Sequence, residues 1–72
     1  MAKAASQETE LQMAERHIAS AEKHVVQQEE LVSRLKLDGL PTDAAEELLS
    51  IFRSTLDCHR QHHNRIMTEL GR

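Results

Sequence analysis

The feature that most constrains this chain is a single break in an otherwise helical sequence. Before the penultimate residue, the only strong helix breakers are Gly39 and Pro41, which lie two residues apart. Glycine can end a helix in the left-handed conformation, and proline cannot continue one. The sequence therefore predicts two helices joined by one turn. The expected bounds are about residues 6–37 for the first helix, 38–42 for the turn and about 43–70 for the second helix.

Residues near the start of the first stretch are typical of a helix N-terminus. Thr9 and Gln12 have the spacing of a capping box, in which two side chains accept hydrogen bonds from each other's backbone N–H groups. The first helix is therefore expected to begin near Ser6 or Thr9. Residues 1–8 are expected to fray, and a single helical-hairpin domain is expected to cover residues 9–72.

The residues around the turn predict where one helix stops and the next begins. The glycine can end the first helix, after which Leu40 can fold back onto Leu35. Thr42 or Asp43 can cap the second helix. Glu46 lies three residues after Asp43, so these two residues are expected to form a second capping box.

Mostly apolar residues recur in alternating steps of three and four along both stretches, and we call these positions the seam. In the first stretch they are Leu11, Ala14, Ile18, Ala21, Val25, Gln28, Val32 and Leu35. In the second stretch they are Ala45, Leu49, Phe52, Leu56, His59, His63, Ile66 and Leu70. This spacing is typical of a coiled coil. The predicted fold class is therefore all-α, an antiparallel two-helix hairpin with a coiled-coil-like seam.

Charged residues beside the seam provide an independent check of how the helices align. Antiparallel helices joined by a short turn place opposite each other residues whose numbers sum to about 80. One flank, which we call the charged flank, then pairs opposite charges: Lys36 with Glu46, Glu29 with Arg53 and Glu22 with Arg60. Farther from the turn, Glu15 falls opposite Met67 and ends the series. Exposed pairs contribute only ~0.2–1 kcal/mol each, so they select the alignment more than they stabilise the fold.

The other flank of the seam carries almost no charge. We call it the uncharged flank, and its residues are Leu31 opposite Leu48, His24 opposite Thr55 and His17 opposite His62, with Ile51 and Cys58 alongside. A two-helix hairpin has only one internal seam. Leu31, Leu48 and Ile51 are therefore expected to be exposed together near the turn unless another protein covers them.

A second copy of the chain is the expected partner for this surface. A chain of 72 residues with one Phe, no Trp and no Tyr buries too little apolar surface to be comfortably stable alone. Most soluble oligomers are symmetric homo-oligomers, and a twofold axis across the uncharged flank would give a four-helix bundle. The predicted homodimer interface consists of Leu31, Leu48, Ile51, Thr55, His24, His17 and His62. An unidentified protein partner is the alternative occupant of this surface.

Five histidines are the one compositional excess of the chain. The candidate metal ligands, which come to similar height in the proposed hairpin, are His17, His59, His62, His63 and Cys58. Zinc and copper accept imidazole and thiolate ligands, so a bundle that binds or senses a transition metal is the alternative function. Without an HExxH or CxxC motif, the favoured expectation is that these side chains pack, with no metal or other cofactor. Buried neutral imidazoles would also make the assembly weaken in acid.

Charge and composition exclude several other classes of function. Nine Lys and Arg against twelve Asp and Glu give a net charge of −3, which argues against nucleic acid or a membrane surface as partner. There is no membrane-spanning apolar run and no signal-peptide core, so a cytoplasmic location is expected. Cys58 and His59 diverge as neighbours on a helix and form no catalytic pair. We therefore expect a non-catalytic, self-associating small protein that serves as a protein-interaction or regulatory module.

Three short segments carry a recognisable pattern, namely His17–Val25, Leu35–Thr42 and Leu56–His62 followed by Arg65-Ile66. A His-Ile-Ala opening, a glycine turn followed by threonine, and a His-Arg-x-His segment resemble a family of short, uncharacterised bacterial helical-hairpin proteins. The matching positions are His17, Gly39, Thr42, His59, Arg60 and His62. Leu40-Pro41 and His63-Asn64 depart from the family's pattern. The resemblance implies a helical hairpin and brings no activity with it.

Overall fold

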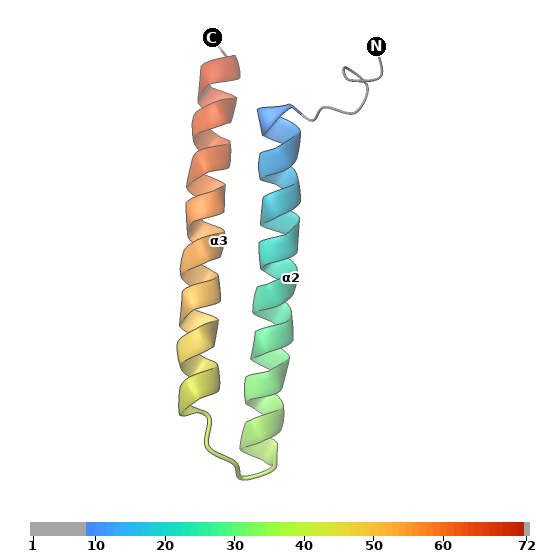
Figure 1. The fold of residues 1–72 in the computed structure, drawn as a ribbon, viewed down its shortest axis with the longest axis vertical. Helices are drawn as coiled ribbons and strands as arrows, with labels where there is room; N and C mark the ends of the chain where they lie inside the picture. Colours follow the sequence, from blue (N-terminus) through green and yellow to red (C-terminus); the bar gives the residue numbers. More distant parts are fainter. Residues whose placement is uncertain (1–8, 72) are drawn as a thin grey trace.

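The described residues of the chain fold into two α-helices that lie side by side and run in opposite directions (Figure 1). In the computed structural model, which describes residues 9–71, α2 covers Glu10–Leu37 and α3 covers Asp43–Leu70. No strand occurs in these described residues. Within the same part of the chain, no helix has the length and apolar character needed to cross a membrane. The predicted all-α pair of packed helices is confirmed.

A capping box starts α2, as the sequence predicted. The Gln12 backbone N–H donates to Thr9 Oγ1 at 3.0 Å, and the Thr9 backbone N–H donates to Gln12 Oε1 at 3.2 Å. Thr9 has the extended backbone that an N-cap requires, with φ −71° and ψ 161°. The helix therefore begins at Glu10, directly after Thr9, which is one of the two expected starting points. The predicted fraying of residues 1–8 lies outside the described residues.

The glycine stop signal at the end of α2 is confirmed. Gly39 has a φ of +72°, the left-handed conformation that side chains with a Cβ rarely adopt. The Gly39 N–H donates to the Lys36 carbonyl oxygen at 3.1 Å, and the Leu40 N–H donates to the Leu35 carbonyl oxygen at 2.9 Å. These two bonds form a Schellman motif, which satisfies carbonyl groups at the helix end. The return of the chain from Leu40 toward Leu35 is thus made by the backbone.

The start of α3 differs from the prediction. Thr42 is the N-cap, but its backbone lies near the helical region, with φ −114° and ψ 0°, and its side chain makes no capping bond. Its hydroxyl instead donates to Glu46 Oε2 at 2.8 Å, and its carbonyl oxygen accepts from the Glu46 N–H at 2.8 Å. The expected capping box of Asp43 and Glu46 does not form, because Asp43 is already inside the helix.

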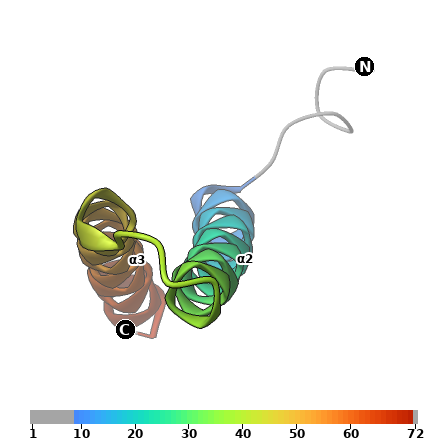
Figure 2. The same cartoon turned by 90° about the horizontal axis from the view of Figure 1, so that it is seen from below.

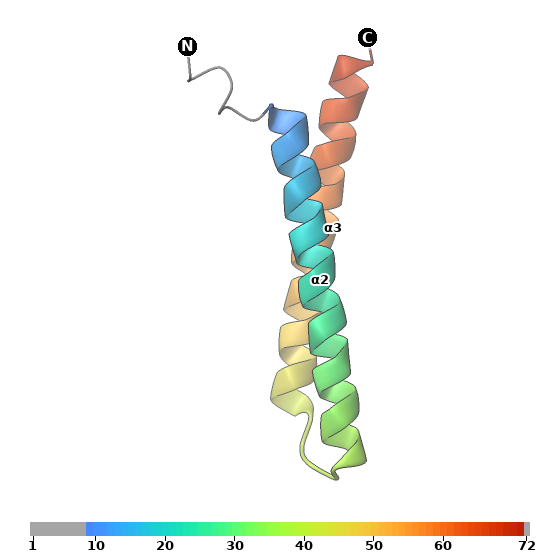
Figure 3. The same ribbon diagram turned by 90° about the vertical axis from the view of Figure 1, so that its right-hand side faces the viewer.

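The buried residues all lie on the predicted seam. They are Ala14, Ala21, Gln28, Val32, Leu49, Leu56 and Ile66. The other seam residues are half-buried except Leu70, which is 66% exposed. The alignment rule places Leu70 opposite Leu11, but Leu70 lies largely in solvent. Leu70 is the last residue of α3, and Figure 1 and Figure 3 show that α3 extends beyond the start of α2 at this end of the hairpin, which we call the open end.

One polar side chain is buried in the seam, and its hydrogen bond explains its position. Gln28 is buried and its Nε2 donates to the Ala45 carbonyl oxygen at 2.9 Å. A buried amide without a partner would cost free energy, whereas this bond joins α2 to the first turns of α3. Among the described residues, no buried side-chain nitrogen or oxygen lacks a hydrogen-bond partner.

Candidate interaction surface

The charged flank is closed by the ion pairs that the alignment predicted. Lys36 Nζ lies 3.9 Å from Glu46 Oε2. Arg53 Nη2 donates to Glu29 Oε2 at 2.9 Å, and Arg60 Nη2 donates to Glu22 Oε2 at 3.1 Å. All six side chains are about half exposed, so the pairs contribute little to stability but confirm the alignment of the helices.

A fourth pair, which the sequence analysis missed, extends this series toward the open end. His63 Nε2 lies 3.6 Å from Glu15 Oε2, an ion pair when the imidazole is protonated. The alignment rule had placed Met67 opposite Glu15, because the rule assumes two straight helices whose axes do not cross. The structure instead brings the half-buried His63 ring, one turn before Met67, to this carboxylate. His63 is thereby drawn to the charged flank.

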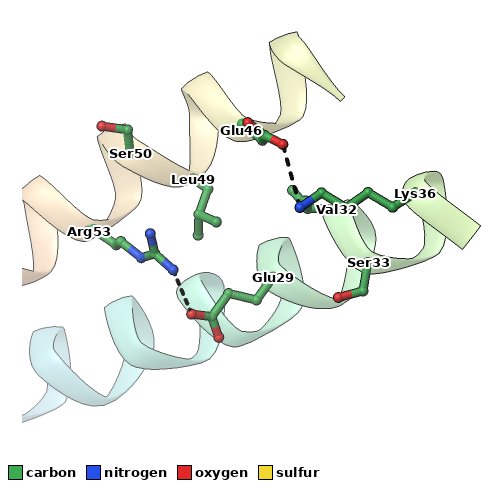
Figure 4. Close-up of a pocket in the computed structure, with 8 residues that line it drawn as sticks. All are labelled: Glu29, Val32, Ser33, Lys36, Glu46, Leu49, Ser50 and Arg53. Carbon is green, nitrogen blue, oxygen red and sulfur yellow. Dashed lines mark hydrogen bonds and ion pairs between the residues drawn. The ribbon is translucent and has the colours of Figure 1, made fainter. Parts of the chain in front are cut away.

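A groove of about 470 Å³ lies on the charged flank near the turn (Figure 4). The buried side chains of Val32 and Leu49 line it, with Ser33 and Ser50 at its edges. The pairs of Glu29 with Arg53 and of Lys36 with Glu46 border it, so its four charged residues already neutralise one another. This groove therefore does not present unpaired charge to a ligand.

The uncharged flank is open along its length. Near the turn, Leu31 is 44% exposed, Leu48 is 41% exposed and Ile51 is 54% exposed. The remaining five residues of this flank are also exposed: His17, His24, Thr55, Cys58 and His62. Figure 2 looks along the helices from the turn and shows that no third element of the described chain covers either flank.

Aromatic contacts give the uncharged flank a second apolar component. The His24 ring stacks on Phe52, with ring centroids 5.7 Å apart, and the His17 ring lies 5.2 Å from the His59 ring at an angle of 47°. Phe52 and His59 are half-buried seam residues, so each exposed histidine covers one of them. The flank thus continues the seam outward rather than forming a separate polar surface.

The candidate metal ligands do not converge in one chain. His63 faces Glu15, His59 packs against His17, and Cys58 is exposed. His17 and His62 line one shallow depression of about 130 Å³, so these two do come together across the helices. Within residues 9–71, no group of three or more His, Cys, Asp or Glu side chains is placed to hold a metal ion. A metal site built from these histidines would need ligands from another chain.

One exposed apolar residue escaped the sequence analysis of this surface. Met13 is 41% exposed and lines the same depression as His17 and His62. Its position, four residues before His17 on the same helix face, is the signal that could have assigned it to the flank. Met13 extends the apolar character of the uncharged flank to the open end.

Comparisons of the chain with known proteins do not bear on the role of this surface. Neither the protein-family models nor the curated proteins nor the solved structures contain a match to the chain. The resemblance to a family of short bacterial hairpin proteins therefore stays a prediction.

Proposed function

We propose that this protein is a non-catalytic interaction module that binds a second copy of itself through the uncharged flank. The observation that carries the proposal is the joint exposure of Leu31, Leu48 and Ile51 on a flank that has no Asp, Glu, Lys or Arg until the open end. A twofold dimer across this flank is a four-helix bundle. Its role in the cell would be that of a protein-interaction or regulatory module.

The small core of the hairpin supports this proposal. No large side chain in residues 9–71 is completely buried, and three of the seven buried residues are Ala14, Ala21 and Gln28, which contribute little apolar area. Apolar burial is the main driving force for folding, so a chain with so little of it gains much from a second contact surface. The uncharged flank is the surface with apolar area to contribute.

The two flanks also differ in the electrostatic cost of packing against a second copy of the chain. The acidic and basic side chains of the charged flank already satisfy one another, and burying these pairs would carry a desolvation penalty. The residues of the uncharged flank carry no formal charge, and the charged residues that follow them, Glu10, Arg65 and Glu69, lie exposed at the open end. A second copy is therefore accommodated on the uncharged flank at a lower electrostatic penalty.

Substitution of one apolar residue on each flank tests the proposal. Leu48→Glu places a charge in the proposed interface and is expected to give a monomer, whereas the unchanged chain elutes as a dimer in size-exclusion chromatography with light scattering. Val26→Glu is the matched control, because Val26 is 50% exposed beside Glu29 and Glu30, away from the uncharged flank. It should leave the dimer intact. Circular dichroism checks that both variants remain helical.

Two outcomes would overturn the proposal. A dimer that persists in Leu48→Glu but is lost in Val26→Glu would move the interface to the other flank. A monomer at every concentration of the unchanged chain would leave the uncharged flank to a different protein, which is the alternative that the sequence analysis retained.

A further inference from the structure

The uncharged flank changes in character from the turn to the open end. Its three exposed aliphatic residues, Leu31, Leu48 and Ile51, lie near the turn, whereas Met13, His17 and His62 lie toward the open end. Exposed charged residues follow beyond the two histidines: Glu10, Arg65 and Glu69. The surface that a second copy contacts therefore depends on whether its turn lies at the same end as the turn of the first copy or at the opposite end.

Two symmetric alignments place the uncharged flanks of two hairpins face to face. With the twofold axis parallel to the helices, both turns lie at the same end, and α2 of one copy packs on α3 of the other. With the axis perpendicular to the helices, the turns lie at opposite ends, and each helix packs on its own copy. Neighbouring helices are antiparallel in both cases, so helix dipoles do not choose between them.

The perpendicular axis matches apolar residues with polar ones. Leu48 and Arg65 lie equally far from the middle of α3, so Leu48 of one copy meets Arg65 of the other when the helices overlap fully. Ile51 likewise meets His62. This alignment would either bury a guanidinium beside leucine or leave the leucine partly in water, and both are unfavourable.

We propose that the second copy docks with its turn at the same end as the turn of the first. Leu31 of one copy then packs on Leu48 and Ile51 of the other, because the ion pairs fix Leu31 and Leu48 at the same height within each hairpin. The apolar residues of both copies gather in one cluster near the turns, three from each. Glu10, Arg65 and Glu69 of both copies then lie at the same end, the open end, where they are exposed in each hairpin. This inference rests on the proposed homodimer and specifies its geometry.

Distances between spin labels on the outer face of α3 test this alignment. Labels are attached at Glu47→Cys, Ser54→Cys or Thr68→Cys, each with Cys58→Ser, at exposed positions opposite the seam. With the turns together, all three label pairs should show a similar separation, set by the width of the bundle. With the turns apart, the rise of 1.5 Å per residue would add about 30 Å along the axis at Glu47 and at Thr68 but under about 10 Å at Ser54. Ser54→Cys is therefore the internal control.

The outcomes separate this inference from the proposed function. Equal separations at the three positions, measured by pulsed electron paramagnetic resonance, support the alignment with the turns together. Markedly longer separations at Glu47 and Thr68 than at Ser54 overturn the alignment and retain the dimer. Loss of dipolar coupling at all three positions, with a monomer mass for the labelled chains, overturns both. Sedimentation of Cys58→Ser alone, compared with the unchanged chain, checks that removing the thiol has not itself split the dimer.

Discussion

Phe52 is the largest apolar side chain of the seam, yet it is only half-buried and uses the His24 ring as its cover. Sequence reasoning placed it in the core because of its spacing. A seam between only two helices surrounds a large ring on fewer sides than the core of a larger domain does. His24, which covers Phe52, belongs to the uncharged flank. It therefore takes part both in packing within the hairpin and in the proposed interface.

Replacing Phe52 measures this partial burial. Phe52→Ala is expected to lower the free energy of unfolding by about 2–3 kcal/mol, below the ~3–5 kcal/mol of a fully buried ring. Urea denaturation followed by circular dichroism measures the change. Leu37→Ala is the control, because Leu37 is 88% exposed and should change stability by less than about 0.5 kcal/mol. Equal effects of the two substitutions would remove Phe52 from the seam.

The histidines provide a second test at the scale of single residues. The ring contact of His17 with His59 and the pairing of His63 with Glu15 indicate packing and ion pairing, so a zinc titration followed by calorimetry should show no stoichiometric binding. The metal alternative predicts one zinc per two chains, lost in His17→Ala or His62→Ala. It also predicts that binding survives in His24→Ala, since His24 stacks on Phe52 at mid-length.

At the scale of the helices, the two ends of the turn were not equally predictable. Gly39 ends α2 as expected, because a left-handed residue after a helix is a local requirement that glycine meets by itself. Thr42 does not cap α3 with its side chain, because capping depends on a backbone geometry that the whole turn decides. Its hydroxyl and Lys36 instead share the Glu46 carboxylate, which ties the turn to both helices.

The backbone of Gly39 can be tested directly. A Cβ at this position would meet no atom within 4 Å, so Gly39→Ala changes the backbone energy without a clash. We expect a loss of about 1 kcal/mol, the cost of the left-handed conformation less the reduced freedom of the unfolded chain. Gly39→Asn should cost less, since asparagine adopts this conformation more readily. Thermal melts that rank alanine above glycine would contradict the assignment of the turn.

The ion pairs between α2 and α3 can be tested by reversing charges. Glu29→Arg places two arginines opposite each other and should lower stability by about 0.5–1 kcal/mol at low salt. Adding Arg53→Glu should restore most of the loss, and high salt should reduce both effects. Glu30→Arg is the control, because it changes the charge equally on the outer face of α2. The same loss in Glu30→Arg would mean that net charge, not pairing, is responsible.

At the scale of the molecule, residues 9–71 form one layer of two helices, and the shortest extent of the structure is only 14 Å. The seam, the alignment and three ion pairs of this layer could be predicted from the sequence, because each depends on spacing along regular helices. The pair of Glu15 with His63 and the exposure of Leu70 could not, because they depend on where the two helices lie relative to each other in space. What covers Leu31 and its neighbours depends on a second molecule, so the sequence supports only an inference there.

The mass of the unchanged chain in solution tests the central claim most directly. Sedimentation equilibrium at several concentrations near neutral pH should give twice the mass of the 8.2 kDa chain, with dissociation only on strong dilution. The dimer is expected because the apolar residues of the uncharged flank leave water when two copies meet. A mass of one chain across the whole concentration range, with full helicity by circular dichroism, would contradict the account.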